Sequence, residues 1–201
     1  MSYDLRQACT SLVVATLLLL SGCGPSEDPG TDASSVLRRG NQAEPQTLDP
    51  HRSEGTAAGN VLRDLYEGLV TEAADGSIEP GVASAWSVSD DGRTWRFALR
   101  EGLTWSNGDP LTAADFVAGL RRTVDPQTAS AYAPVLAPIA GAGEIIAGSA
   151  AVESLGVVAP DSQTLEIRLE QPTPYFLDLL TNPSTYPLHQ PSFAEYGRDF
   201  V

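Results

Sequence analysis

The most regular hydrophobic pattern in this chain is an alternation within residues 94–100. Trp95, Phe97 and Leu99 occupy every second position, with arginine or alanine between them. A period of two is typical of a strand that is buried on one face. An Asp-Asp-Gly turn separates this segment from a shorter apolar one at 86–88. The pattern therefore predicts a β-hairpin.

Other apolar segments predict further strands. Residues 157–159 and 164–169 flank a Pro-Asp-Ser turn and are expected to pair. A short strand is also expected at 35–40.

Two longer segments have helical spacing. Apolar residues recur at steps of three and four in residues 56–70, which predicts an amphipathic helix that closes near Gly68. Thr112 and Asp115 form a near capping box before a second helix, in which Arg121-Arg122 suits the C-terminal dipole. Shorter helices are predicted at 144–147, 175–180 and 193–196. Together these elements indicate an α/β protein.

Composition excludes several function classes. The chain has 201 residues, 42% of them apolar and 19% charged, as in globular proteins. Its 26 acidic residues and 12 basic ones, all arginine, give a formal charge of −14. Nucleic acids and anionic membranes need clustered basic charge, so neither is an expected partner.

The N-terminal segment has the features of a secretion signal. The apolar run at 12–20 is too short to span a membrane and fits the core of a signal peptide. Small residues then precede Cys23, as in the bacterial lipobox, so we expect a signal peptide at 1–22 and lipidation of Cys23. The alternative is an ordinary signal peptide with an incidental cysteine. The polar stretch that follows, 23–35, is expected to be a flexible tether.

No motif points to catalysis, a metal or a cofactor. His51 and His189 lie in separate loops near prolines, so a structural or exposed role is favoured over metal binding. The glycines of 141–148 do not have dinucleotide-binding spacing, and no serine lies in a nucleophile elbow. We therefore expect no enzyme and no cofactor. The three tryptophans, at 86, 95 and 105, are interpreted as core residues rather than as a stacking wall for sugars or peptides.

Residues 91–116 resemble the bacterial solute-binding proteins of peptide ABC importers. That family shows DG-x-TW-x-F-x-LR followed by W-S-(D/N)-G-x-P-(L/V)-T-A-x-D-F, and the segment matches both without a gap. Four flanking pieces resemble the oligopeptide-binding branch, which includes the murein-tripeptide binder: 47–51, 61–69, 125–130 and 172–176.

The resemblance implies a periplasmic-binding-protein-like α/β fold of class II, in which two lobes close on the ligand and an extra domain is inserted into the first. On this template, 36–53 begins the first lobe, 54–170 is the inserted domain and 171–201 returns to the first lobe. Family members are much longer. The expected fold is therefore incomplete, with the first lobe partial and the second absent.

The resemblance also implies the ligand and its site. Oligopeptide binders hold an extended peptide through main-chain hydrogen bonds. The segment that lines the peptide backbone corresponds to Glu54-Gly55-Thr56, and a pocket tyrosine corresponds to Tyr132. Gly55 would let a backbone approach closely, and Glu54 could pair with a cationic group. The alternative interpretation of Glu54-Gly55-Thr56 is a simple loop turn without a role in binding.

The expected function is that of a monomeric lipoprotein in the periplasm or cell envelope, anchored at Cys23, which delivers oligopeptides to the permease subunits of an ABC importer. The chain is expected to be a truncated copy. One alternative is a short envelope lipoprotein that acts as an interaction module. Another is an envelope hydrolase, which would need a nucleophile or acid pair that the sequence does not nominate.

Overall fold

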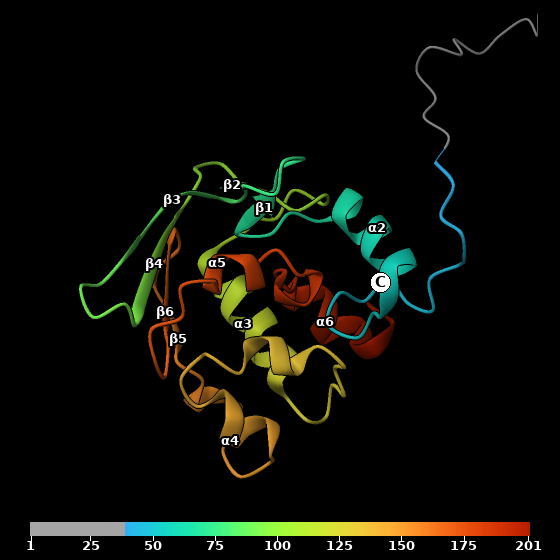
Figure 1. The fold of residues 1–201 in the computed structure, drawn as a ribbon. Coiled ribbons are helices and arrows are strands. Elements are labelled where there is room, and N and C mark those ends of the chain that lie inside the picture. The colour runs from blue at the N-terminus through green and yellow to red at the C-terminus, as the bar shows by residue number, and fades with distance from the viewer. Residues whose placement is uncertain (1–38) are drawn as a thin grey trace, which may run out of the picture. The chain divides into compact units, whose positions relative to one another are not determined.

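The alternating pattern forms part of a four-stranded antiparallel sheet in the computed structural model, which describes residues 39–201. Its strand order is β3-β4-β6-β5, and Figure 1 shows these strands side by side. The strands are β3 (Ala83–Val88), β4 (Thr94–Leu99), β5 (Val157–Asp161) and β6 (Thr164–Arg168). Both predicted strand pairs are confirmed.

Burial explains the register of the central pair. In β4, Trp95, Phe97 and Leu99 are buried, and the residues between them are exposed. Trp95 pairs with Ile167 and Phe97 with Leu165, so apolar residues of both strands lie on one face. That face forms the core, and a shift of one residue would expose all of them.

Helix α3 (Ala113–Val124) packs against β5 and β6. Its start is fixed by the predicted capping box, because the Asp115 carboxylate accepts a hydrogen bond from the Thr112 backbone N–H (2.8 Å) and lies 3.1 Å from its hydroxyl. The helix ends before Asp125 and Pro126, as expected.

The predicted helix at 56–70 is too long. Helix α2 covers Gly55–Leu65, the chain is extended from Tyr66, and Val70 already begins strand β1 (Val70–Glu72). That strand pairs with β2 (Ile78–Pro80) in an antiparallel hairpin. The helical spacing continued through Leu69 by coincidence, since that side chain is buried beside a strand.

The remaining helices are short. They are η1 (Ala133–Leu136), α4 (Ala142–Ile146), η2 (Val152–Ser154), α5 (Phe176–Leu179), η3 (Pro183–Thr185), α6 (Gln190–Tyr196) and η4 (Gly197–Asp199). Predictions at 144–147, 175–180 and 193–196 are confirmed, with shifted ends. None of the helices within residues 39–201 reaches the length and hydrophobicity that a membrane span requires.

Several predictions lie beyond this part of the chain. The signal peptide, Cys23 and the tether are outside the described residues, as is most of the strand expected at 35–40. Residues 41–201 form one compact unit. The boundaries of the lobe and its inserted domain stay a prediction.

The core interpretation of the tryptophans is confirmed for Trp95, which packs against Phe97 and Phe176. Trp86 is half-buried against the same core. Trp105 differs, because its half-buried ring lines a surface hollow instead.

Candidate functional site

Three of the four predicted ligand-binding residues line one pocket. Gly55, Thr56 and Tyr132 contribute to a hollow of about 230 Å³. The other lining residues are Ser53, Gly59, Arg63, Asn182 and Pro183. The backbone N–H of Gly55 donates to the hydroxyl of Tyr132 (3.3 Å), although 77 positions separate the two residues. Glu54 is exposed and lies outside the lining, directly before α2.

Gly55 is needed for its backbone conformation. Its φ of +77° lies in the left-handed region, which side chains other than glycine rarely adopt. A Cβ atom built there would meet nothing within 4 Å. The space beside Gly55 is therefore open, as close approach by another backbone would require.

The pocket presents hydrogen-bond donors. The Tyr132 oxygen accepts from Gly55, which leaves its O–H to donate. The side-chain oxygen of Asn182 accepts from the Ser184 N–H (3.0 Å), which leaves its amide NH₂ as a donor. Arg63 adds a cation, and among the described residues that line the pocket none is acidic. Such a lining suits carbonyl or carboxylate oxygens.

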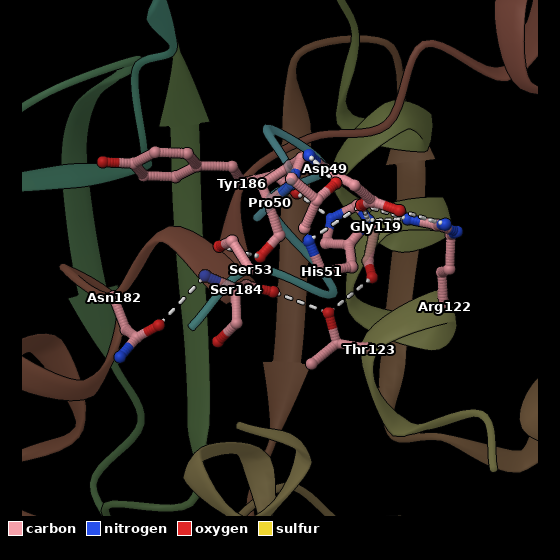
Figure 2. A network of polar contacts seen from close by, with 11 residues as sticks. Asp49, Pro50, His51, Ser53, Gly119, Arg122, Thr123, Asn182, Ser184 and Tyr186 are labelled. Carbon is pink, nitrogen blue, oxygen red and sulfur yellow. Dashed lines mark hydrogen bonds and ion pairs between the residues drawn. The ribbon is translucent and has the colours of Figure 1, made fainter. Parts of the chain in front are cut away.

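A buried ion pair belongs to a polar network that also includes Ser53 and Asn182 of the pocket lining (Figure 2). The guanidinium of Arg122 donates to both carboxylate oxygens of Asp49, each at 2.6 Å. The two residues are only 8% and 1% exposed. The sequence does not predict this pair, because Arg122 lies at a helix end, where a cation is explained by the helix dipole alone. The only signal was an acid in a Pro-containing loop, which names no partner.

His51 completes this cluster as a neutral side chain. Its Nδ1 lies 2.8 Å from Arg122, and since arginine only donates, Nδ1 must accept. Its Nε2 therefore carries the proton and donates to the Tyr186 carbonyl (2.9 Å). Burial, with a contribution from the Arg122 charge, lowers the pKa of His51 to about 4. The structural role expected for this histidine is confirmed.

The segment that contributes Asn182 and Pro183 to the pocket is tied to helix α3. The hydroxyl of Thr123 donates to the Ser184 carbonyl (2.6 Å), as Figure 2 shows. Gly119 allows the backbone at Tyr186 to lie close to α3, because a Cβ there would collide with the Tyr186 carbonyl oxygen.

Aromatic rings cover the guanidinium of Arg122. Its carbon lies 4.7 Å from the ring centre of Phe193 and 5.1 Å from that of Phe200. Desolvation strengthens such cation–π contacts. The C-terminal residues of the described chain thus pack onto the same cluster.

His189 has a separate structural role. Its Nε2 lies 2.9 Å from the Asp109 carboxylate, and its Nδ1 accepts from the Ser192 N–H (3.2 Å) at the start of α6. Hydrogen bonds from Asn107 and then His189 lower the pKa of Asp109. This histidine joins a turn to a helix. No group of three potential metal ligands occurs within residues 39–201.

A larger hollow of about 580 Å³ lies at the C-terminal end of α2. Leu65, Leu103 and Trp105 are among the residues that line it. None of the predicted ligand-binding residues reaches it, so volume alone does not identify the site.

Comparison with known proteins gives a consistent family match. The family model "Bacterial extracellular solute-binding proteins, family 5 Middle" matches residues 77–200. The periplasmic oligopeptide-binding protein OppA of Escherichia coli (strain K12) is 46% identical over 168 residues, 83% of this chain and 31% of that protein. The probable deoxycholate-binding periplasmic protein YgiS of the same strain is 46% identical over 164 residues, 81% of this chain and 31% of that protein.

Solved structures agree. Haemophilus influenzae OppA in complex with the peptide RPPGFSPFR superposes with a TM-score of 0.78 at 44% identity, covering 80% of this chain and 32% of that one. The periplasmic murein tripeptide binding protein MppA, in its unliganded open form, gives a TM-score of 0.73 at 43% identity, covering 76% and 30%. The chain spans about a third of the length of the curated relatives it matches.

Proposed function

Because the chain belongs to the bacterial extracellular solute-binding proteins of family 5, we propose that it contributes the main-chain-binding surface of a peptide-binding protein that serves an ABC importer. The observation that carries the proposal is the pocket in which Gly55, Thr56 and Tyr132 meet. Relatives named as oligopeptide-binding proteins, and a solved substrate-binding domain of an oligopeptide ABC transporter from Bacillus anthracis, support it. The family is one of binding proteins, so no catalytic role is proposed.

The proposed mechanism is recognition of an extended peptide by its backbone. Peptide carbonyl oxygens would accept from the Tyr132 hydroxyl and the Asn182 amide, and Gly55 would let the peptide main chain approach. Glu54, exposed directly before Gly55, would pair with a cationic group of the ligand. Main-chain contacts provide affinity without depending on side-chain identity, which suits a binder of varied peptides.

The proposed location is the periplasm or cell envelope, because the relatives compared above are named as periplasmic proteins. We propose a monomer, lipidated at Cys23, that docks on the permease subunits. Mass spectrometry of membrane-extracted protein tests the anchor: a lipid adduct on the wild type and its loss in Cys23→Ser are expected. Unmodified Cys23 in the wild type would contradict it.

Calorimetry with tri- to pentapeptides tests the binding proposal. The wild-type chain should release heat, and Tyr132→Phe should weaken binding about tenfold because it removes one donor. Tyr175→Phe is the matched control, since Tyr175 is an exposed tyrosine outside the pocket lining. Absence of binding to every peptide, or equal affinity for wild type and Tyr132→Phe, would contradict the proposal.

A second candidate ligand follows from the relative named as probable deoxycholate-binding, which is as identical to this chain as OppA is. A titration with deoxycholate therefore accompanies the peptides. Heat from deoxycholate alone would favour this second ligand. Heat from neither, together with a stable complex with another envelope protein, would favour the interaction module.

A further inference from the structure

We infer that Arg122 and Thr123, adjacent residues of helix α3, are positioning residues that hold the walls of the pocket in place. Neither residue lines the pocket, so each acts through others. The inference rests on the proposed function for its ligand, but the geometry of the walls can be measured without any ligand.

Arg122 fixes the first wall through Asp49. The bidentate ion pair holds the start of a tight turn, in which the Asp49 carbonyl accepts from the Ser53 N–H (2.8 Å). Ser53 is buried and lines the pocket, and Gly55 follows two residues later. A displacement of Asp49 would therefore move the backbone of Gly55 and the open space beside it.

Thr123 fixes the second wall through Ser184. Its fully buried hydroxyl donates to the Ser184 carbonyl at 2.6 Å, closer than its second acceptor, the Gly119 carbonyl at 3.1 Å. The Ser184 N–H in turn donates to the side-chain oxygen of Asn182. Asn182 and Pro183 form this side of the pocket. The Thr123 hydroxyl thus sets where the Asn182 amide lies.

The two walls are also joined directly. His51 lies in the segment of the first wall, and it donates to the carbonyl of Tyr186, which lies in the segment of the second wall (Figure 2). Gly119 leaves room for both groups against the helix.

The third wall is the segment that contains Tyr132, and it follows the C-terminal end of α3. The Thr128 N–H donates to the Asp125 carbonyl (3.0 Å), and Ala129 has a φ of +55°. This turn directs the chain to Tyr132, which meets Gly55. Residues 119–125 therefore support all three segments of the pocket.

Thr123→Val tests the inference, because it preserves shape and removes the hydroxyl. Thr123→Ser keeps the hydroxyl and should therefore behave like the wild type. Ile167→Val is the matched control, since it trims a buried side chain of the sheet and leaves the pocket segments untouched. Denaturant unfolding first establishes the stability loss of each variant.

Hydrogen exchange on the unliganded chain is the first measurement. Thr123→Val should speed exchange in residues 182–186 about tenfold relative to Ile167→Val, because local opening loses one buried hydrogen bond. Thr123→Ser should exchange like the wild type. Equal exchange in Thr123→Val and Ile167→Val would overturn the inference.

Peptide affinity is the second measurement. Thr123→Val should bind tri- to pentapeptides about tenfold more weakly than Ile167→Val, since a hydrogen bond is worth about that factor. Unchanged affinity in Thr123→Val would overturn the positioning role in binding. If the wild-type chain binds no peptide, the proposed function fails, while the exchange result still decides whether Thr123 positions the walls.

Discussion

The buried carboxylate of Asp49 has a hydrogen-bond donor for each of its oxygens. It accepts two hydrogen bonds from Arg122 and one from the backbone N–H of His51 (3.0 Å). Burial of two charges costs several kcal/mol, and only close geometry with additional hydrogen bonds offsets it. The aromatic rings over Arg122 add cation–π attraction. The cluster is therefore sensitive to loss of any one member.

Asp49→Ala should lower the free energy of unfolding by about 3–5 kcal/mol, because it leaves the Arg122 charge buried without its partner. Urea denaturation measures this loss. The control is Glu67→Ala, which breaks the exposed pair with Arg100 (2.6 Å) and should cost at most about 1 kcal/mol. Similar losses in both variants would show that Arg122 is solvated.

His51 should make stability depend on pH. Its pKa is about 4 in the folded chain against 6.5 when exposed, so the unfolded state binds more protons between these values. Stability is therefore fully present above pH 6.5 and falls as pH drops towards 4. The loss from pH 7 to pH 5 should be about 2 kcal/mol from this group.

His51→Gln isolates this contribution, because glutamine does not titrate. Chemical denaturation at pH 7 and pH 5 gives, for each of the two proteins, the change in the free energy of unfolding on acidification. The wild type should lose more stability on acidification than the variant. Equal losses would mean that His51 is protonated inside the fold.

At the scale of the elements, two glycines inside helices should respond oppositely to alanine. In α2, a Cβ on Gly59 would meet only the flexible end of Arg63, at 3.4 Å. In α3, a Cβ on Gly119 would collide with the Tyr186 carbonyl oxygen. Gly59→Ala should stabilise the chain by about 0.5–1 kcal/mol, and Gly119→Ala should destabilise it by about 1–3 kcal/mol.

Thermal or urea unfolding of the two variants checks both signs. The helix propensity gain is common to both substitutions, so their difference reports the packing at Gly119. Stabilisation by Gly119→Ala would show that residues 184–186 can move away from α3. That outcome would also weaken the role of α3 as a support for the pocket.

Elements with local signals could be predicted from the sequence. Alternation located β4, and Thr112 with Asp115 located the start of α3, because both patterns depend on neighbouring residues. The end of α2 could not be predicted in this way. Pairing of β1 with β2 overrode the helical spacing after Leu65, and such pairing depends on residues further along the chain.

At the scale of the whole molecule, the candidate site depended on resemblance. Family motifs indicated Gly55, Thr56 and Tyr132, and the fold brings them to one pocket. Arg122 and Asp49, 73 positions apart, carried no local sign of pairing. An arginine at a helix end is usually solvated, so only the tertiary structure shows that it is buried.

The net charge of −14 should make stability rise with ionic strength. Self-repulsion destabilises the compact state, and about 0.1 M salt shortens its range to about 10 Å. Salt also weakens exposed ion pairs such as Arg96–Glu166 (3.2 Å), but each is worth at most about 1 kcal/mol. We therefore expect a higher urea midpoint in about 0.2 M NaCl than in about 0.01 M NaCl.

The buried pair provides an internal control for this measurement. Screening acts weakly on buried charges, so the stability deficit of Asp49→Ala should be nearly the same at both salt concentrations. The deficit of Glu67→Ala should shrink with salt, because its pair with Arg100 is exposed. A urea midpoint that falls as salt is added would mean that attraction outweighs repulsion across the surface, despite 26 acidic residues against 12 arginines.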